Sequence, residues 1–392
     1  MIRPIHRFHQ GTGEKNRHVV AGMTLEIQET IHPLRIAVLA HLHHPISAPF
    51  AGGMESHTAH LVSGLSSRGH EVTLFAKDGS DTDCRVEPVL DEAFVVRGYP
   101  DQDHLNRQHQ ILDGAMSRAV ARIRTGPYDV VLNNSLSPVP HRVLGGIPTL
   151  HVLHTPALPR LIQAFETQGR SPDPLHRFVT VSESNARAWL RWLPDLHVVH
   201  NGIALERWED DTDPEPGTAA WTGRITPEKG THVAIAAART ASMKLRLAGP
   251  IQDQEYFRTL IAPELDGDIA YVGHLDQGGL RSLVASAQVF ISSPLWEEPF
   301  GLTTVEAMAC GTPVAALPAG AMQELIGTLG GVVAETSGTD ALSTAIMEAK
   351  GMNRAGVREQ ARRFSLETMI DGYEQMFASM LVPPHPRLHG AP

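Results

Sequence analysis

Short apolar runs alternate with stretches of helical spacing in this chain, and the series is completed twice. The first series starts with the run at residues 34–40 (LRIAVLA), and the second starts at residues 219–222, after an acidic, proline-containing segment at 210–217. Apolar runs of this length are typical of buried parallel strands. Parallel neighbours need crossover connections, which the helical stretches between the runs can supply. We therefore expect an α/β fold with two Rossmann-like, doubly wound domains that face a central cleft.

The runs divide the chain into two sets of expected strands and one final helix. The strands are expected at residues 34–40, 71–76, 130–132, 149–153, 178–181 and 197–200, and then at 219–222, 244–248, 270–272, 289–291 and 313–317. An amphipathic stretch predicts a long helix at residues 366–381. The predicted parts are a poorly ordered extension at 1–33, an N-terminal domain at 34–200, a C-terminal domain at 201–365, the helix, and a loose tail at 382–392. Ligands of such folds bind beyond the carboxyl ends of the strands, so the cleft is the expected site.

Composition excludes several classes of partner. The 392-residue chain has a formal net charge of -10, and nucleic acid and anionic membranes prefer basic proteins. No run of about 18 apolar residues predicts a membrane span, and residues 1–32 have no apolar core of a secretory signal. The two cysteines, Cys84 and Cys310, form no metal-type pair, so we expect a cytoplasmic protein. Four arginines in the helical stretch 104–124 are diluted by aspartates, which favours a solvated face and leaves peripheral membrane contact as the alternative.

A glycine turn and a helix start follow the expected strand at 289–291. Gly301 permits a close backbone approach, and a helix opens near Thr303. The N-terminus of a helix offers free N–H groups and the positive end of the dipole, which suits a diphosphate. Glu306, in the first turns, could accept two hydrogen bonds from a ribose diol, and Glu298, before the turn, could reach the hydroxyls of a sugar beyond the phosphate. The alternative is a capped helix with two acids that the dipole favours.

Two cations follow the expected strand at 219–222. The loop carries Arg224 and Lys229, and the whole chain has just five lysines. Phosphate oxygens accept the forked contacts of arginine and the point charge of lysine. These side chains could neutralise a departing diphosphate, and the alternative is a solvated turn.

These motifs together resemble glycosyltransferase family 4, whose members are retaining enzymes of the GT-B fold. The family has a Gly-Arg pair, a Lys-Gly pair and two glutamates separated by seven residues, and the chain shows Gly223-Arg224, Lys229-Gly230, Glu298 and Glu306. The resemblance continues through residues 52–55, 68–72, 181–183, 200–203 and 306–314, and it spans about residues 34–381. The chain departs from the family at Gly320-Ala321, where many members have a Gly-Gly pair before a glutamate.

The resemblance implies roles for residues of the C-terminal, donor-binding domain. Arg224 and Lys229 would hold the donor diphosphate, and Glu306 would bind the ribose. Glu298 would contact the transferred sugar. The backbone nearby would complete the site at Phe300, Gly301, Leu302 and Thr303, and the backbone at Val272 and Gly273 would recognise the base. No metal is expected, because the family resembled is generally metal-independent and the histidines match no zinc spacing.

The N-terminal domain would bind the acceptor. By the same resemblance, the Gly53 amide would approach the phosphate or sugar, His154 would contact the sugar at the acceptor side, and the helix at 366–381 would pack back on this domain. The acceptor walls are expected at residues 41–53 and 133–138, which include Asn133, Asn134 and Ser135.

The expected function is retaining transfer of a hexose or N-acetylhexosamine from a nucleotide-diphosphate sugar, with uridine as the expected base. The catalytic residues would be His154, Arg224, Lys229 and Glu298, with no cofactor beyond the sugar nucleotide. The sequence names neither the acceptor nor the oligomeric state. Two alternatives stay open: a nucleotide-sugar epimerase of the same fold, and a non-catalytic sugar-binding scaffold.

Overall fold

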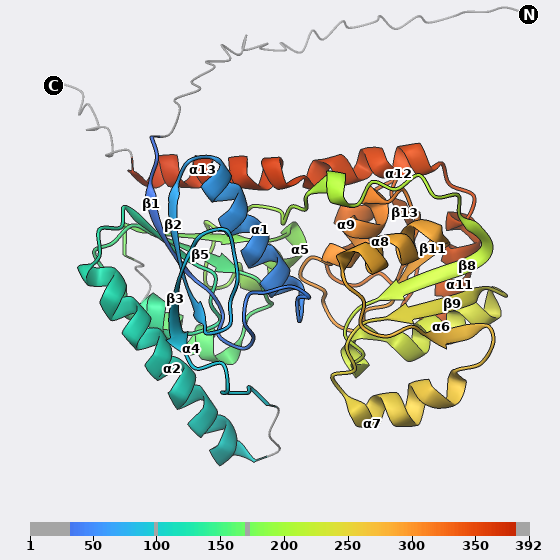
Figure 1. Cartoon of the computed structure of the whole chain (residues 1–392), viewed down its shortest axis with the longest axis horizontal. Helices are drawn as coiled ribbons and strands as arrows, with labels where there is room; N and C mark the ends of the chain where they lie inside the picture. Colours follow the sequence, from blue (N-terminus) through green and yellow to red (C-terminus); the bar gives the residue numbers. More distant parts are fainter. Residues whose placement is uncertain (1–31, 98–100, 169–172, 382–392) are drawn as a thin grey trace, which may run out of the picture. The chain divides into compact units, whose positions relative to one another are not determined.

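The computed structural model describes residues 32–97, 101–168 and 173–381. Most of the expected N-terminal extension and the whole expected C-terminal tail lie outside these ranges. The described chain forms two parallel sheets in succession (Figure 1). The predicted fold class of two doubly wound α/β domains is therefore confirmed.

The first sheet has strand order β3-β2-β1-β4-β5-β6-β7. Its strands are β1 (Arg35–Leu39), β2 (Glu71–Lys77), β3 (Arg85–Leu90), β4 (Val130–Asn133), β5 (Thr149–Leu153), β6 (His176–Thr180) and β7 (His197–Val198). Every pairing is parallel, and Ile36 of β1 lies opposite Val72 on one side and Val130 on the other. All seven strands therefore end at the same edge of the sheet.

The second sheet repeats this arrangement as β10-β9-β8-β11-β12-β13. Its strands are β8 (Glu215–Thr222), β9 (Lys244–Ala248), β10 (Ile269–Tyr271), β11 (Ala287–Ser292), β12 (Val314–Ala316) and β13 (Gly331–Val333). Residues 215–217, at the end of the acidic, proline-containing segment, begin β8, because Glu215 lies opposite Ala287 of β11. The strands β3 and β13 have no counterpart among the predicted strands. The first contains Pro88, which only an edge strand tolerates, and the second has just three residues.

Helices cover both faces of each sheet. The first sheet carries α1 (Gly53–Ser67), α2 (Gln102–Thr125), α3 (Val139–Val143), α4 (Pro159–Gln168) and α5 (Glu183–Trp189). The second carries α6 (Thr231–Thr240), α7 (Gln254–Tyr256), α8 (Gln277–Ser286), α9 (Leu302–Ala309), α10 (Met322–Ile326), α11 (Thr339–Ala349) and α12 (Arg354–Ala361). Short turns of helix lie at η1 (Leu205–Arg207), η2 (Pro227–Lys229), η3 (Phe257–Ile261), η4 (Ala262–Glu264) and η5 (Arg362–Phe364). None of these described helices is long and apolar enough to cross a membrane.

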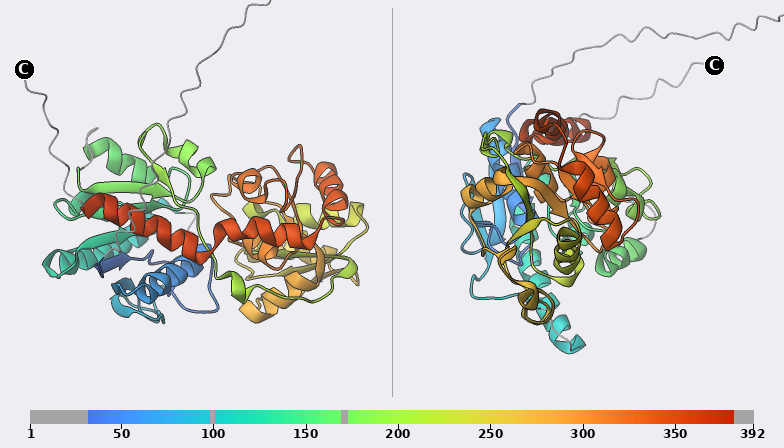
Figure 2. Two further views of the ribbon diagram at one scale, coloured as in Figure 1. Left: turned by 90° about the horizontal axis from the view of Figure 1, so that it is seen from above. Right: turned by 90° about the vertical axis from the view of Figure 1, so that its right-hand side faces the viewer.

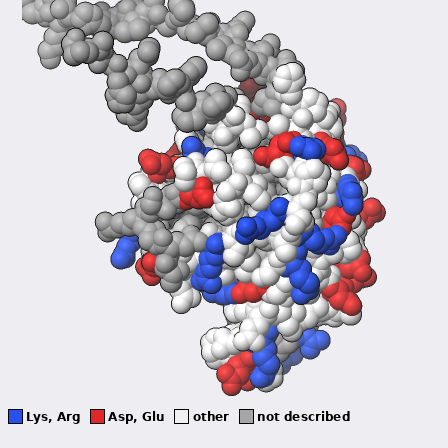
Figure 3. All heavy atoms as spheres, turned by 90° about the vertical axis from the view of Figure 1, so that its left-hand side faces the viewer, with Lys and Arg blue, Asp and Glu red and all other residues white. Residues whose placement is uncertain are grey.

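Three of the four arginines of α2 bind the protein itself. Arg118 donates to the carbonyl of Val89 at 3.1 Å, Arg122 pairs with Glu87, and Arg124 donates to the carbonyl of Val143 at 3.1 Å. Figure 3 looks onto this side of the molecule, where Lys and Arg gather among uncharged surface with Asp and Glu around them. These arginines anchor α2 to the neighbouring β3 and α3.

The chain crosses between the two sheets twice, and the crossings pair with each other. Ile203 lies in the first crossing and its amide donates to Phe364 O at 3.0 Å, while the Leu366 amide donates back to Ile203 O at 2.8 Å. The last helix, α13 (Leu366–Leu381), then returns to the first sheet and packs along α1 (Figure 2). Its apolar face buries Ile370 against Gly64, and Arg68 of α1 pairs with Asp371 at 2.6 Å.

The paired crossings predict a sharp cost for Gly202→Ala. A methyl group at Gly202 would lie 2.3 Å from Ser365 O and 2.8 Å from Met369 Cβ, so the two crossings would have to separate. Overpacking of this kind costs about 1–3 kcal/mol. The matched control is Gly267→Ala, whose methyl group would meet no described heavy atom within 4 Å. Denaturant unfolding should show a lower midpoint for Gly202→Ala alone, and equal midpoints for the two variants would contradict the crossing geometry.

Candidate active site

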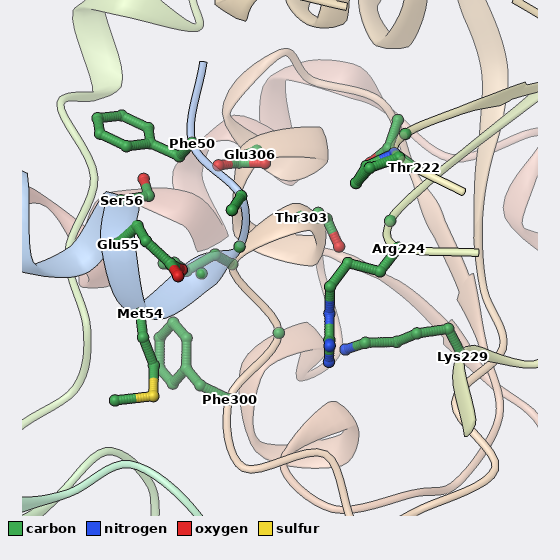
Figure 4. Close-up of a pocket in the computed structure, with 18 of the residues that line it drawn as sticks. Phe50, Met54, Glu55, Ser56, Thr222, Arg224, Lys229, Phe300, Thr303 and Glu306 are labelled. Atoms are coloured by element: carbon green, nitrogen blue, oxygen red, sulfur yellow. The ribbon is translucent and has the colours of Figure 1, made fainter. Parts of the chain in front are cut away.

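Both sheets reverse their strand order beside their first strand. In the first sheet β1 lies between β2 and β4, and in the second β8 lies between β9 and β11. The loops that leave the carboxyl ends of such strands diverge to opposite faces and open a crevice. A cavity of about 720 Å³ lies there, lined by the loops after β1, β4, β5, β8 and β11 (Figure 4). Loops from both sheets therefore meet at one site.

The start of α9 forms a cradle on the second-half side. Gly301 precedes the helix with φ of 102°, a left-handed conformation that favours glycine. A methyl group there would also lie 2.6 Å from Met322 Cε. The first amides of α9 have no partner inside the helix, and the Thr303 side chain points into the cavity (Figure 4). The arrangement suits an anion such as a diphosphate.

The two predicted cations both reach this cavity. Figure 4 shows the side chains of Arg224 and Lys229 pointing toward one another within it. Arg224 donates to Gln252 Oε1 at 2.7 Å. The loop is fixed against β11, because Gly230 follows Lys229 with φ of 65° and a methyl group there would lie 2.0 Å from Ser293 O.

Glu298 forms an ion pair with Lys229. Lys229 Nζ donates to Glu298 Oε2 at 2.6 Å, and the indole N–H of Trp296 donates to the same oxygen at 2.9 Å. Lys229 Nζ also lies 5.4 Å from the centre of the Trp296 ring. Because both donors use Oε2, the other carboxylate oxygen is left for a ligand.

The loop at 320–321, where the chain departs from the family pattern, supports Glu298 through the main chain. The Ala321 amide donates to Glu298 O at 2.9 Å. Gly320 has φ of 60°, and a methyl group there would lie 2.1 Å from the same oxygen. Ala321 is fully buried. The contact therefore requires glycine at position 320. At position 321 it uses only the backbone amide, which alanine supplies as well as glycine does.

Glu306 lies in the second turn of α9 and lines the cavity. Burial raises its pKa to about 7, because a low-dielectric environment disfavours the charged carboxylate. A ribose diol placed here would supply the hydrogen bonds that the carboxylate lacks.

The first half contributes Gly53 and His154. Gly53 begins α1, and a methyl group on it would lie 3.4 Å from Leu302 Cδ1, so α1 meets the donor-side loop directly. His154 Nε2 lies 2.9 Å from Asn134 Oδ1, and the Asn134 amide donates to Thr58 Oγ1 at 3.3 Å. Since Asn134 Oδ1 accepts, His154 Nε2 carries the proton. Burial lowers the His154 pKa to about 3, which leaves Nδ1 of a neutral ring as an acceptor.

Among the described residues, five predicted site positions lie outside the cavity: Asn133, Asn134, Ser135, Val272 and Gly273. Their polar groups already have partners inside the protein. Asn133 Nδ2 donates to a histidine ring at 2.9 Å, and the Ser135 hydroxyl donates to Asn133 Oδ1 at 2.6 Å. The Val272 amide donates to Leu247 O, and Gly273 O accepts from the Gly249 amide. The cavity is lined instead by the next four residues, 274–277.

The structure also brings in residues to which no role was assigned from the sequence. Glu55 and Trp296 line the cavity. In the sequence, both lie inside motifs in which we assigned roles to other residues. A signal for Glu55 was present, because a carboxylate in the first turn of a helix after a strand-end loop falls at the crevice. Trp296 gave no such signal, since its partner oxygen depends on how the loop folds.

Glu324 bridges the two halves beside the site. Its Oε1 accepts from the Glu183 amide at 3.0 Å and lies 2.6 Å from His200 Nε2, and its Oε2 accepts from the Ser184 amide at 3.3 Å. Burial alone would raise the Glu324 pKa, but these hydrogen bonds hold it below its usual value. The carboxylate thus caps α5 of the first half from α10 of the second.

Two family models together cover the chain from the loop after β1 to the second crossing. The model described as Glycosyltransferase Family 4 matches residues 51–207, and that described as Glycosyl transferases group 1 matches residues 204–365. The chain belongs to this family of glycosyltransferases. The cations, the two glutamates and the α9 cradle all lie in the group 1 part.

Named relatives span most of this glycosyltransferase. It is 28% identical to D-inositol 3-phosphate glycosyltransferase of Mycobacterium avium (strain 104), with 74% of this chain and 79% of the relative covered. It is 27% identical to glycogen synthase of Mycobacterium tuberculosis (strain ATCC 25618 / H37Rv), with 70% and 76% covered.

Solved structures share the GT-B fold. Sucrose-phosphate synthase from Thermosynechococcus elongatus superposes with a TM-score of 0.70 at 20% identity, covering 88% of this chain and all of that one. HepE from Anabaena, in complex with UDP-glucose, superposes with a TM-score of 0.68 at 19% identity over the same shares. At such identities the likeness establishes the fold.

Glu306 predicts a pH dependence of stability. Its pKa is about 7 in the folded protein against an ordinary value of 4.5, so between these values the unfolded chain releases a proton that the folded protein keeps. Stability should therefore fall as pH rises from 4.5 to 7, by at most about 3 kcal/mol. Below 4.5 the penalty is absent, and above 7 it is complete. Urea unfolding of the wild type and Glu306→Gln should diverge over this range, and a constant difference would contradict the prediction.

Proposed function

We propose that this glycosyltransferase moves a hexose or N-acetylhexosamine from a uridine diphosphate sugar to an acceptor hydroxyl, with retention of configuration. The observation that carries the proposal is the meeting of Arg224, Lys229, Glu306 and the start of α9 in one cavity. This set matches a sugar nucleotide group by group: cations and helix amides for the diphosphate, and a carboxylate for the ribose.

The transferred sugar would lie between the halves. Glu298, with one oxygen free, faces the sugar hydroxyls from the donor side, and His154 offers its Nδ1 lone pair from the other. As the bond to the diphosphate breaks, negative charge grows on the leaving oxygen, where Arg224, Lys229 and the α9 amides stabilise it. The acceptor hydroxyl attacks from the side on which the diphosphate leaves, and the departing phosphate oxygen takes its proton. This route gives retention without a protein nucleophile.

Base recognition would fall to the loop after β10. Its residues 274–277 line the cavity. Within the described structure, the backbone N–H and C=O of His274 have no hydrogen-bond partner in the protein, whereas the two preceding residues are engaged. A donor and an acceptor on adjacent peptide units suit the imide edge of uracil. The solved HepE complex, which holds UDP-glucose on the same fold, supports uridine as the base.

Calorimetry tests the donor. Uridine diphosphate should bind more tightly than guanosine or adenosine diphosphate, and the reverse ranking would contradict uridine recognition. Mass spectrometry of the enzyme with its donor separates the alternatives. A glycosylated acceptor with retained configuration supports the proposal, sugar isomerised without acceptor indicates an epimerase, and no turnover with any acceptor indicates a scaffold.

The Lys229–Glu298 pair predicts different effects for the two glutamates. A diphosphate must compete with Glu298 for Lys229, so Glu298→Gln should leave uridine diphosphate affinity equal or raise it, while turnover falls. Glu306→Ala should instead weaken the nucleotide and the sugar nucleotide alike, by about 1.5–3 kcal/mol for a lost hydrogen bond to a charged group. Calorimetry and steady-state kinetics on both variants provide the comparison. Equal losses of nucleotide affinity would show that the roles are assigned wrongly.

A further inference from the structure

The residues of the N-terminal half that line the cavity, here called the wall, carry little formal charge. Among the described residues from this half that line the cavity, Glu55 is the one with a formally charged side chain. It is 4% exposed, it lies in the first turn of α1, and Figure 4 shows its carboxyl pointing into the cavity. The rest of the wall consists of imidazoles, the hydroxyl side chains of Ser56 and Thr155, and apolar side chains that include Pro49, Phe50, Met54 and Leu136.

Several imidazoles of this wall carry no charge near neutral pH. Burial lowers the pKa of His41 and of His43 to about 4, and that of His154 to about 3. The His43 amide donates to His41 Nδ1 at 3.4 Å, so the His41 proton is on Nε2, which lies 3.3 Å from Glu55 Oε1. The neutral His41 ring therefore lies beside the carboxylate without forming an ion pair with it, and burial raises the pKa of Glu55 above its usual value.

The cations behind this wall are already occupied. Lys77, at the end of β2, is 4% exposed and donates to Phe94 O at 2.6 Å and to His43 O at 3.5 Å. Arg160, at the start of α4, pairs with Asp113 at 2.5 Å. A phosphate or carboxylate group placed against the wall would meet Glu55, and the described first half brings no Lys or Arg side chain to the cavity beside it. The charge of Arg224, in the second half, also acts on Glu55. Like charges at short range in a poorly solvated site are strongly unfavourable.

We propose that Glu55 binds the acceptor, and that the acceptor is a polyol, such as a sugar, with no anionic group at this wall. The proposal rests on the proposed transferase function and names its acceptor class. An acceptor hydroxyl donates to the carboxylate, a charge-assisted bond stronger than one between neutral groups. The apolar C–H face of the polyol packs on Phe50 and Pro49. Glu55 excludes phosphorylated polyols by repulsion, which is how a site discriminates against a close analogue.

Matched pairs of acceptors test the class. The wild-type enzyme with its donor is given glucose and glucose 6-phosphate, and myo-inositol and its monophosphate, with products measured by mass spectrometry. Ligand-observed NMR on the enzyme with uridine diphosphate bound reports acceptor affinity without turnover. We expect each phosphate ester to react and to bind at least tenfold more weakly than its parent. An ester that binds or reacts as well as its parent, or better, would overturn the proposal.

Variants test the residue. Glu55→Gln should raise the acceptor KM at least tenfold and narrow the preference for the unphosphorylated member of each pair, with uridine diphosphate affinity unchanged. Glu55→Lys should reverse the preference toward the ester, and if it does not fold, Glu55→Gln decides. The control is Glu71→Gln, an exposed acid at the start of β2, which should change neither quantity. An unchanged acceptor KM and preference in Glu55→Gln would refute the role of Glu55, whereas failure of uridine diphosphate to bind the wild type would refute the proposed donor instead.

Discussion

The parallel direction of every strand pairing is the constraint on which the site depends. Parallel neighbours need a crossover connection, which is usually a helix. All the strands of a sheet therefore end at the same edge, and most of them are followed by a loop that leads into a helix, although a loop alone joins β2 to β3. The strand order reverses beside β1 and beside β8, and there the loops part. Gly53 follows the first reversal, and Arg224 and Lys229 follow the second. The strand order therefore brings these functional residues to one cavity, and no local sequence motif is needed to bring them together.

The fold class could be predicted because the apolar runs are short and recur with helical stretches between them. Runs such as 149–153 and 244–248 match β5 and β9 residue for residue. The strands that escaped prediction lie at sheet edges, where partial exposure removes the apolar signal: β3 carries a proline and two charges, and β13 is three residues long. An edge strand forms because it pairs with a neighbouring strand, and the local sequence does not show which strands will be neighbours.

The candidate site likewise contains some features that the sequence could predict and others that it could not. The residues that follow a strand end by a fixed turn, Arg224, Lys229, Gly301 and Glu306, line the cavity as expected from their motifs. Val272 and Gly273, which we expected to recognise the base, do not line the cavity, because their backbone groups bond to Leu247 and Gly249, and the next four residues line it instead. Which oxygen of Glu298 is occupied, and that His154 is neutral with a free Nδ1, depend on contacts between segments far apart in sequence. No spacing rule contains that information.

The paired crossings have a consequence for the integrity of the chain. The first crossing leads into residues 211–213, which are exposed, and exposed polar segments are the usual sites of proteolytic nicking. A cut there would break one connection, but the second crossing would still run from the second sheet into α13, which is packed on α1. The fragments would stay associated through Ile203, whose hydrogen bonds to Phe364 and Leu366 join the crossings by main chain. A nicked enzyme should therefore keep both walls of its cavity in place, and the same segment offers a point for new termini in a permuted chain.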